Sequence, residues 1–135
     1  MRLLSHIDLR VRDGARALAF YDTLLAEFGF LRVTEPPFTA VEPTWRRERW
    51  EANDEFFGFI VDPEFVPNQN RIAFHASSRD QVDRVTDAAR KANARDIDGP
   101  EDYGGYYASF FEDPDGNRLE VCFLTKHGGL PGNAI

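Results

Sequence analysis

Two histidines and one acid are the residues of this sequence best suited to chemistry, and each lies in a strand-like stretch. Glu120 stands between Leu119 and Val121, while His6 and His75 alternate with apolar neighbours. Two histidines and a carboxylate form the protein ligand set of many non-haem iron sites. A buried carboxylate with neither a metal nor a partner is costly, so Glu120 needs one of the two. Which of them it has depends on the elements that position these side chains.

The first half of the chain reads as a strand, a helix and further strands. Residues 3–12 alternate between apolar and polar side chains, with His6 on the polar face, which predicts a half-buried strand. Asp13 is a suitable N-cap for the helix that follows, and Gly29 is suited to end it. The sequence that follows predicts extended segments at about 31–35, 46–52 and 56–61.

The second half repeats this order of elements. Residues 71–76 alternate again, and Ser78 with Gln81 forms a capping-box pattern that predicts a second helix. Residues 106–124 predict a hairpin with Asp115-Gly116 at its turn. The second half is therefore also a strand, a helix and then strands.

This repeated order makes the protein α+β, with two sheets that each carry a helix on one face. We expect one domain over residues 1–135, made of modules at about 1–62 and 68–125. The acidic run 96–102 reads most simply as a loop, and residues 128–133 as part of a short irregular C-terminal arm.

Composition and charge narrow the range of possible binding partners. The net charge of −7 argues against a nucleic-acid surface, and the basic run at 46–49 is short and interrupted by an acid. No apolar run approaches the roughly 18 residues that span a bilayer, so we expect no membrane partner. The single cysteine, Cys122, excludes an intrachain disulfide. The first residues lack a signal-peptide pattern, so the expected location is the cytoplasm.

Three motifs carry a resemblance to a known family: His6–Val11 (HIDLRV), Ala19–Tyr21 (AFY) and Asp113–Glu120 (DPDGNRLE). Together they resemble the vicinal oxygen chelate superfamily, which includes glyoxalase I, extradiol dioxygenases and the bleomycin- and fosfomycin-resistance proteins. The segment 105–110 (GYYASF) is also similar to a bacterial branch of glyoxalase-like proteins. The resemblance covers nearly the whole chain and is specific for the fold, but it is weak for the reaction.

The resemblance implies a pair of βαβββ modules whose sheets form a cup, with the helices outside. Members commonly bind a divalent metal there through positions on the first, fourth, fifth and eighth strands, and the metal acts as a Lewis acid. His6 matches the first of these positions and Glu120 the last. The fourth-strand position aligns with Phe59, which cannot be a ligand.

The fifth-strand position decides whether the ligand set is complete. His6 lies seven residues before Asp13, and the residue seven before Ser78 is Arg71. His75 shares a face with Arg71 but lies roughly 13 Å further along the strand, at about 3.3 Å per residue. A guanidinium has no lone pair for a metal, and its charge repels a divalent cation. The alternative is a shifted register that brings His75 inward and restores a metal site.

Arg71 offers a replacement for the metal, either as the ion-pair partner of Glu120 or as the clamp for an anionic group such as a carboxylate or phosphonate. Glu120 then serves as a base or as a pairing acid, and His6 as a proton shuttle or hydrogen-bond donor. Tyr106 is the candidate for a catalytic hydroxyl, with ordinary packing as the alternative. Further ligand contacts are expected from Phe59, Phe110 and His75.

The leading hypothesis is a glyoxalase-like protein with a degenerate metal site and no cofactor, which binds a small anionic or aromatic molecule. One alternative is a lactoylglutathione-lyase-like isomerase or a dioxygenase that uses His6 and Glu120 to hold Zn, Ni, Fe or Mn. The dioxygenase class is disfavoured, because residues 98–112 contain no histidine and Phe110 stands where that class has a tyrosine. Another alternative is a drug-sequestering binding protein. By resemblance, we expect a homodimer.

Overall fold

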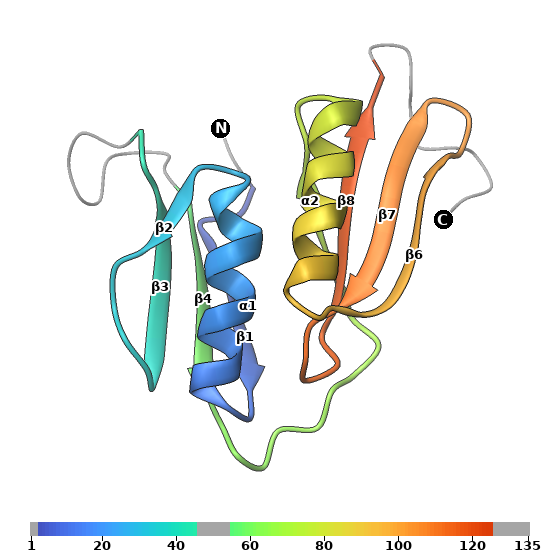
Figure 1. Ribbon diagram of the computed structural model, residues 1–135. Helices are drawn as coiled ribbons and strands as arrows, with labels where there is room; N and C mark the ends of the chain where they lie inside the picture. The colour runs from blue at the N-terminus through green and yellow to red at the C-terminus, as the bar shows by residue number, and fades with distance from the viewer. Residues whose placement is uncertain (1–2, 46–54, 126–135) are drawn as a thin grey trace. The chain divides into compact units, whose positions relative to one another are not determined.

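The chain folds into two compact units, Met1–Val66 (unit 1) and Pro67–Ile135 (unit 2). The computed structural model describes residues 3–45 and 55–125 of them. In each unit one helix lies along a four-stranded sheet, as Figure 1 shows. This is the α+β arrangement predicted from the sequence, with the same order of elements in both halves.

Unit 1 has the strand order β1-β4-β3-β2, in which β1 and β4 are parallel and the other pairs antiparallel. Its elements are β1 (His6–Val11), α1 (Gly14–Ala26), β2 (Phe30–Arg32), β3 (Phe38–Pro43) and β4 (Phe56–Val61). The parallel pair brings the first strand of the unit beside its last.

Helix α1 begins at the cap that the sequence predicts. The side chain of Asp13 accepts a hydrogen bond of 3.1 Å from a backbone N–H of the first turn, which satisfies a donor that the helix leaves unpaired. After the helix, Gly29 adopts a φ of 75°, a left-handed conformation that glycine takes without strain. The ring of Tyr21 contacts Phe57 and Phe59 at centroid distances of 5.1 and 5.2 Å. The odd-numbered residues of β4 therefore face α1.

Unit 2 repeats the topology with the strand order β5-β8-β7-β6. Its elements are β5 (Arg71–His75), α2 (Arg79–Lys91), β6 (Arg95–Asp102), β7 (Tyr106–Glu112) and β8 (Arg118–Leu124). Strands β5 and β8 are parallel, and the other pairs are antiparallel.

Helix α2 also begins at its predicted cap. The hydroxyl of Ser78 accepts a hydrogen bond of 3.0 Å from the backbone N–H of Gln81. The side chain of Gln81 in turn accepts from the backbone N–H of Ser77 at 2.7 Å, one residue before the cap. The hydroxyl of Tyr107 donates a hydrogen bond of 2.6 Å to Asp83 of the helix. The odd-numbered residues of β7 therefore face α2.

The turn between β7 and β8 closes on one carboxylate. Asp113 is 0% exposed, and its side chain accepts from the backbone N–H of Asp115 at 2.9 Å and from that of Asn117 at 2.9 Å. The side-chain amide of Asn117 donates to the same carboxylate at 2.8 Å. Gly116 supplies a φ of 93°. These bonds explain why the turn needs this sequence, and they set the hairpin pairing that positions Glu120.

Two expectations for individual segments were wrong. The acidic run 96–102 is not a loop but lies within β6, which pairs with β7 through two register shifts. Positive φ angles at Asp96 and Gly99 accompany these shifts, and acids are common on edge strands because they discourage further pairing. In unit 1 the strand after Pro37 is β3, over residues 38–43, a segment that was not singled out as extended.

Some expectations fall outside the described residues, namely the strand at 46–52, the basic run at 46–49 and the C-terminal arm. Within residues 3–45 and 55–125, no helix is long and apolar enough to cross a membrane.

Candidate functional site

One face of the unit 2 sheet points away from α2, and it carries most of the predicted site residues. Because directly paired residues share a face, the pairing of β5, β8 and β7 defines this face, here named the distal face. Its members include Arg71 and His75 of β5, Arg118, Glu120 and Cys122 of β8, and Tyr106, Phe110 and Glu112 of β7.

Glu120 is nearly buried on the distal face and has a partner there. Its side chain is 6% exposed, and its carboxylate accepts a hydrogen bond from the hydroxyl of Tyr106. Burial, together with this hydrogen bond and one to Cys122, raises the pKa of Tyr106 above the ordinary value. Burial likewise raises the pKa of the Cys122 thiol. The phenol therefore keeps its proton and is the donor that a buried carboxylate requires.

Arg71 reaches an aromatic ring instead of Glu120. Its guanidinium carbon lies 4.8 Å from the centroid of the Phe110 ring. Since β8 lies between β5 and β7, the Arg71 side chain crosses β8 to make this contact. Among the residues that the structure describes, no carboxylate forms an ion pair with this guanidinium. The ring orients the guanidinium, while its N–H edge stays available to an anion.

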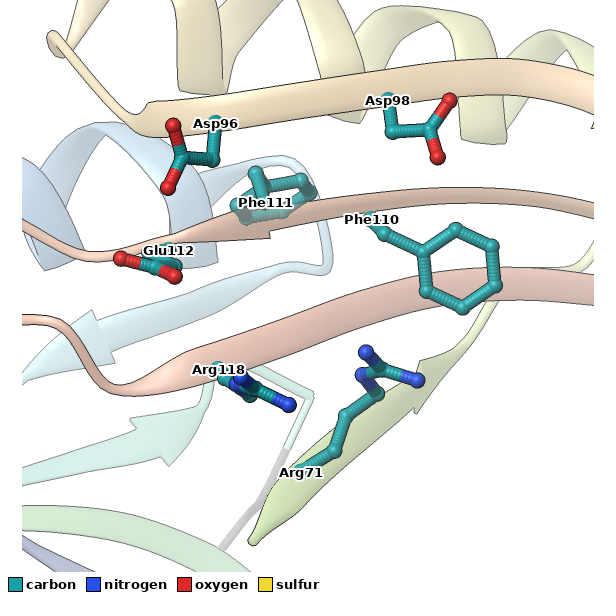
Figure 2. A pocket seen from close by; sticks show the side chains of 7 residues that line it. All are labelled: Arg71, Asp96, Asp98, Phe110, Phe111, Glu112 and Arg118. Carbon is teal, nitrogen blue, oxygen red and sulfur yellow. The ribbon is translucent and has the colours of Figure 1, made fainter. Parts of the chain in front are cut away.

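A pocket of about 390 Å³ opens beside this guanidinium in unit 2. It is lined by Arg71, Asp96, Asp98, Phe110, Phe111, Glu112 and Arg118. Figure 2 shows that the two arginines come from β5 and β8, whereas Asp96 and Asp98 come from β6, on the other side of Phe110. The pocket thus has a basic side, an acidic side and an aromatic residue between them. His75 and Tyr106 share the distal face but do not line this pocket.

His6 lies in unit 1, on the face of the β1–β4 pair that points away from α1. Its ring stacks on Phe56 with centroids 4.3 Å apart and an interplanar angle of 6°. A hydrogen bond of 2.6 Å joins its Nδ1 to the hydroxyl of Ser5, and Nε2 lies 3.8 Å from Asp8. His6 is therefore held by local contacts within unit 1.

The fourth-strand position corresponds to Gly58, and the alignment with Phe59 was wrong by one residue. Phe59 is 1% exposed and packs against α1, so it cannot contribute to ligand contacts on the other face. Asp8 lies five residues before the first helix cap and pairs with Gly58. The residue five before the second cap, Ala73, pairs with Glu120. Gly58 is thus the counterpart of Glu120.

The close packing around Gly58 explains why this position holds a glycine. A Cβ atom there would lie 2.6 Å from a carboxylate oxygen of Asp8 and 3.2 Å from the ring of Phe38. Any larger residue would displace one of these neighbours.

The structure adds two residues that sequence reasoning missed. Arg118 stands directly opposite Arg71 in the β5–β8 pair, so two arginines are neighbours on the distal face. Glu42 is 7% exposed on β3 and shares a sheet face with Gly58. Residues 38–43 (FTAVEP) show no apolar–polar alternation that would have marked Glu42. No local signal pairs Arg118 with Arg71, because that neighbourhood forms only when β5 meets β8.

The four positions expected to hold a metal are occupied by His6, Gly58, Arg71 and Glu120, of which two can donate to a metal. Within the described parts of the chain, no group of three or more His, Cys, Asp and Glu side chains is arranged to hold a metal ion. The residues present therefore do not fit the four-ligand set that the resemblance implies.

The fold is α+β, with two repeated units that each contain a four-stranded mixed sheet. This fold is the first of two observations that identify the class of protein. The chain belongs to the Glyoxalase/Bleomycin resistance protein/Dioxygenase superfamily, whose model matches residues 3–121. It is 28% identical to the uncharacterized protein YqjT of Bacillus subtilis (strain 168) over 130 residues, which cover 87% of this chain and 96% of YqjT.

Solved structures share the fold. A glyoxalase/bleomycin resistance protein from Albidiferax ferrireducens T118 has a TM-score of 0.74 at 20% identity, covering 90% of this chain and 98% of that chain. TnmS3, an antibiotic binding protein from Streptomyces sp. CB03234, has a TM-score of 0.65 at 19% identity, covering 93% of this chain and 98% of that chain.

Proposed function

We propose that this protein binds a small anionic molecule on the distal face of unit 2, with Arg71 as the residue that holds the anion. The observation that carries the proposal is the guanidinium of Arg71, which lies over Phe110 beside a pocket and forms no ion pair among the described residues. A guanidinium fork binds a carboxylate or phosphonate through two parallel hydrogen bonds. Arg71 thereby takes the place that a metal ligand has in other members of the superfamily.

The proposal includes no divalent metal. Gly58 has no donor side chain and Arg71 is a cation, so His6 and Glu120 are left without the other two ligands. The alternative is a metal-dependent lyase or dioxygenase that holds Zn, Ni, Fe or Mn through His6 and Glu120. This alternative needs donors that the chain does not offer at the expected positions.

The hydrogen-bonded pair of Tyr106 and Glu120 leaves two uses of the site open to experiment. An enzyme would use Glu120 as a base and Tyr106 as a proton donor, whereas a binding protein would use only the pocket. TnmS3, which shares the fold, is an antibiotic binding protein and so supports sequestration as a candidate function. Recovery of a bound molecule chemically unchanged favours the binding protein, and its recovery as a product favours the enzyme.

We further propose a cytoplasmic homodimer, because small members of the superfamily often pair. Light scattering of the purified protein then gives the mass of two chains of 15.4 kDa each. The mass of one chain contradicts the dimer.

The anion-binding role of Arg71 is tested with 4-methylbenzoate as the probe, titrated into isotope-labelled protein and followed by NMR. We expect shifts at residues of β5, β7 and β8, and an affinity that falls by about tenfold or more in Arg71→Gln, since a charge-assisted hydrogen-bond pair is lost. Arg84→Gln, which removes an exposed arginine of α2, is the matched control and leaves the affinity unchanged. Equal affinities of Arg71→Gln and the wild type would contradict the proposal.

A further inference from the structure

We infer that the ligand of the unit 2 pocket is dipolar, with an anionic group at one end, a cationic group at the other and a flat apolar body between them. The inference rests on the proposed function, because Arg71 holds the anionic end. It adds the recognition of a positive charge, which the superfamily resemblance does not supply.

The basic side of the pocket is formed by two guanidinium groups, and Glu112 is the cross-strand neighbour of one of them, Arg118. Arg71 and Arg118 are directly opposite in the β5–β8 pair, and both line the pocket. Neither forms an ion pair among the described residues. Like charges directly opposite each other on a sheet destabilise it, and a bound anion shared by both relieves that repulsion. One anionic group is therefore favoured on this side.

The acidic side of the pocket carries two carboxylates that form no ion pair within the described part of the chain. Asp96 and Asp98 are exposed on β6, and in the described part of the chain their side chains form neither a hydrogen bond nor an ion pair. Glu112 lies 3.7 Å from Arg95 and is partly neutralised by it. A ligand that is only an anion is attracted by the arginines but repelled by these aspartates. A ligand that also has a cationic end is attracted on both sides of the pocket.

Phe110 separates the two sides and sets the kind of spacer that fits. It lies on β7, which is between β8 and β6 in the sheet, and its ring already carries the guanidinium of Arg71. Neighbouring strands are about 4.8 Å apart, so β6 lies roughly 10 Å from β8, which carries Arg118, and the Arg71 side chain reaches across β8 from β5 to Phe110. A flat ring with charges at its opposite ends suits this spacing. An α-amino acid, whose two charges are adjacent, does not.

Three matched probes test the inference by NMR titration: 4-(aminomethyl)benzoate, 4-methylbenzoate, which lacks the ammonium, and 4-methylbenzylamine, which lacks the carboxylate. We expect the dipolar probe to bind about fivefold more tightly than 4-methylbenzoate, the gain of one partly exposed charge pair. The double variant D96N/D98N removes this gain without weakening the binding of 4-methylbenzoate. Asp87→Asn, on the exposed side of α2, is the control and keeps the gain.

The outcomes separate the inference from the proposed function. Equal affinities for the dipolar probe and 4-methylbenzoate overturn the inference, while an Arg71-dependent affinity for 4-methylbenzoate keeps the proposed function. A gain that persists in D96N/D98N also overturns the inference, because the aspartates are then not its source. Failure of 4-methylbenzoate and the dipolar probe to bind contradicts both.

Discussion

At the scale of single residues, the acid in an apolar strand is explained by the phenol beside it. Glu120 is nearly buried, and Tyr106 supplies its hydrogen bond. A buried carboxylate is stable only when its oxygens are paired, and a tyrosine with a raised pKa pairs them without introducing a charge. This arrangement leaves Arg71 available for another anion.

Replacement of Tyr106 by phenylalanine tests this pair. Tyr106→Phe removes the hydroxyl that donates to the Glu120 carboxylate, and we expect the free energy of unfolding to fall by about 1–3 kcal/mol in urea denaturation. In a Glu120→Leu background, the same substitution should have almost no further effect, since no buried acceptor remains. Equal losses in the two backgrounds would show that the hydroxyl matters for another reason.

The one-residue error at Phe59 also belongs to this scale. A strand alternates its faces at every residue, so an alignment that is off by one moves a side chain from the helix side to the opposite side. The composition of residues 56–61, in which five of six residues are apolar, gives no alternation that could have fixed the register. Pairing of Asp8 with Gly58 fixes it, and that contact joins distant parts of the chain.

At the scale of elements, the features that the sequence predicted are those set by neighbours in the chain. The caps at Asp13 and Ser78 and the turn at Asp115-Gly116 each depend on side chains and backbone groups within a few residues. Strand β6 was missed because its acids and irregular backbone resemble a loop until β7 pairs with it. The arginine pair was missed for the same reason, since it exists only when β5 and β8 are side by side.

The turn before β8 gives a prediction about the element that carries Glu120. Asp113→Ala removes the acceptor of three hydrogen bonds in a fully buried site, and we expect the free energy of unfolding to fall by about 3 kcal/mol. Asp113→Asn keeps a carbonyl oxygen that accepts from the two backbone donors, so its free energy of unfolding should fall much less than that of Asp113→Ala. Urea denaturation of both variants measures the difference, and similar losses would contradict the account of the turn.

The contact of α2 with β7 predicts a dependence on alkaline pH. The hydrogen bond to Asp83, then burial and the charge of Asp83, raise the pKa of Tyr107 above its ordinary value of 10.0. The folded protein therefore holds this proton to higher pH than the unfolded chain. The stability that it contributes is fully present below pH 10 and is lost as the pH rises through the folded pKa.

The comparison of wild type with Tyr107→Phe measures this effect. Urea midpoints from about pH 8 to about pH 11 should show a difference between the two proteins that narrows above about pH 10. In an Asp83→Asn background, which lacks the charged acceptor, the effect of Tyr107→Phe on the urea midpoint should also be smaller. A difference that stays constant over this range would rule out Tyr107 as its source.

At the scale of the whole molecule, two units with one plan carry different chemistry at equivalent positions. By the count from the helix caps His6 corresponds to Arg71, and by strand pairing Gly58 corresponds to Glu120. In each unit, one of these two positions holds a side chain that can donate to a metal and the other does not. Membership of the superfamily fixes the fold but not what the fold binds.

The central claim, that an arginine takes the place of the metal, is tested most directly by the metal dependence of anion binding. The measurement is the affinity of chelator-treated protein for 4-methylbenzoate, before and after addition of Zn, Ni, Fe or Mn, with elemental analysis of the same samples. We predict an affinity that does not change with metal and no stoichiometric metal in the protein. Binding that appears only with a metal, near one per chain in the wild type and absent in His6→Ala, would contradict the claim.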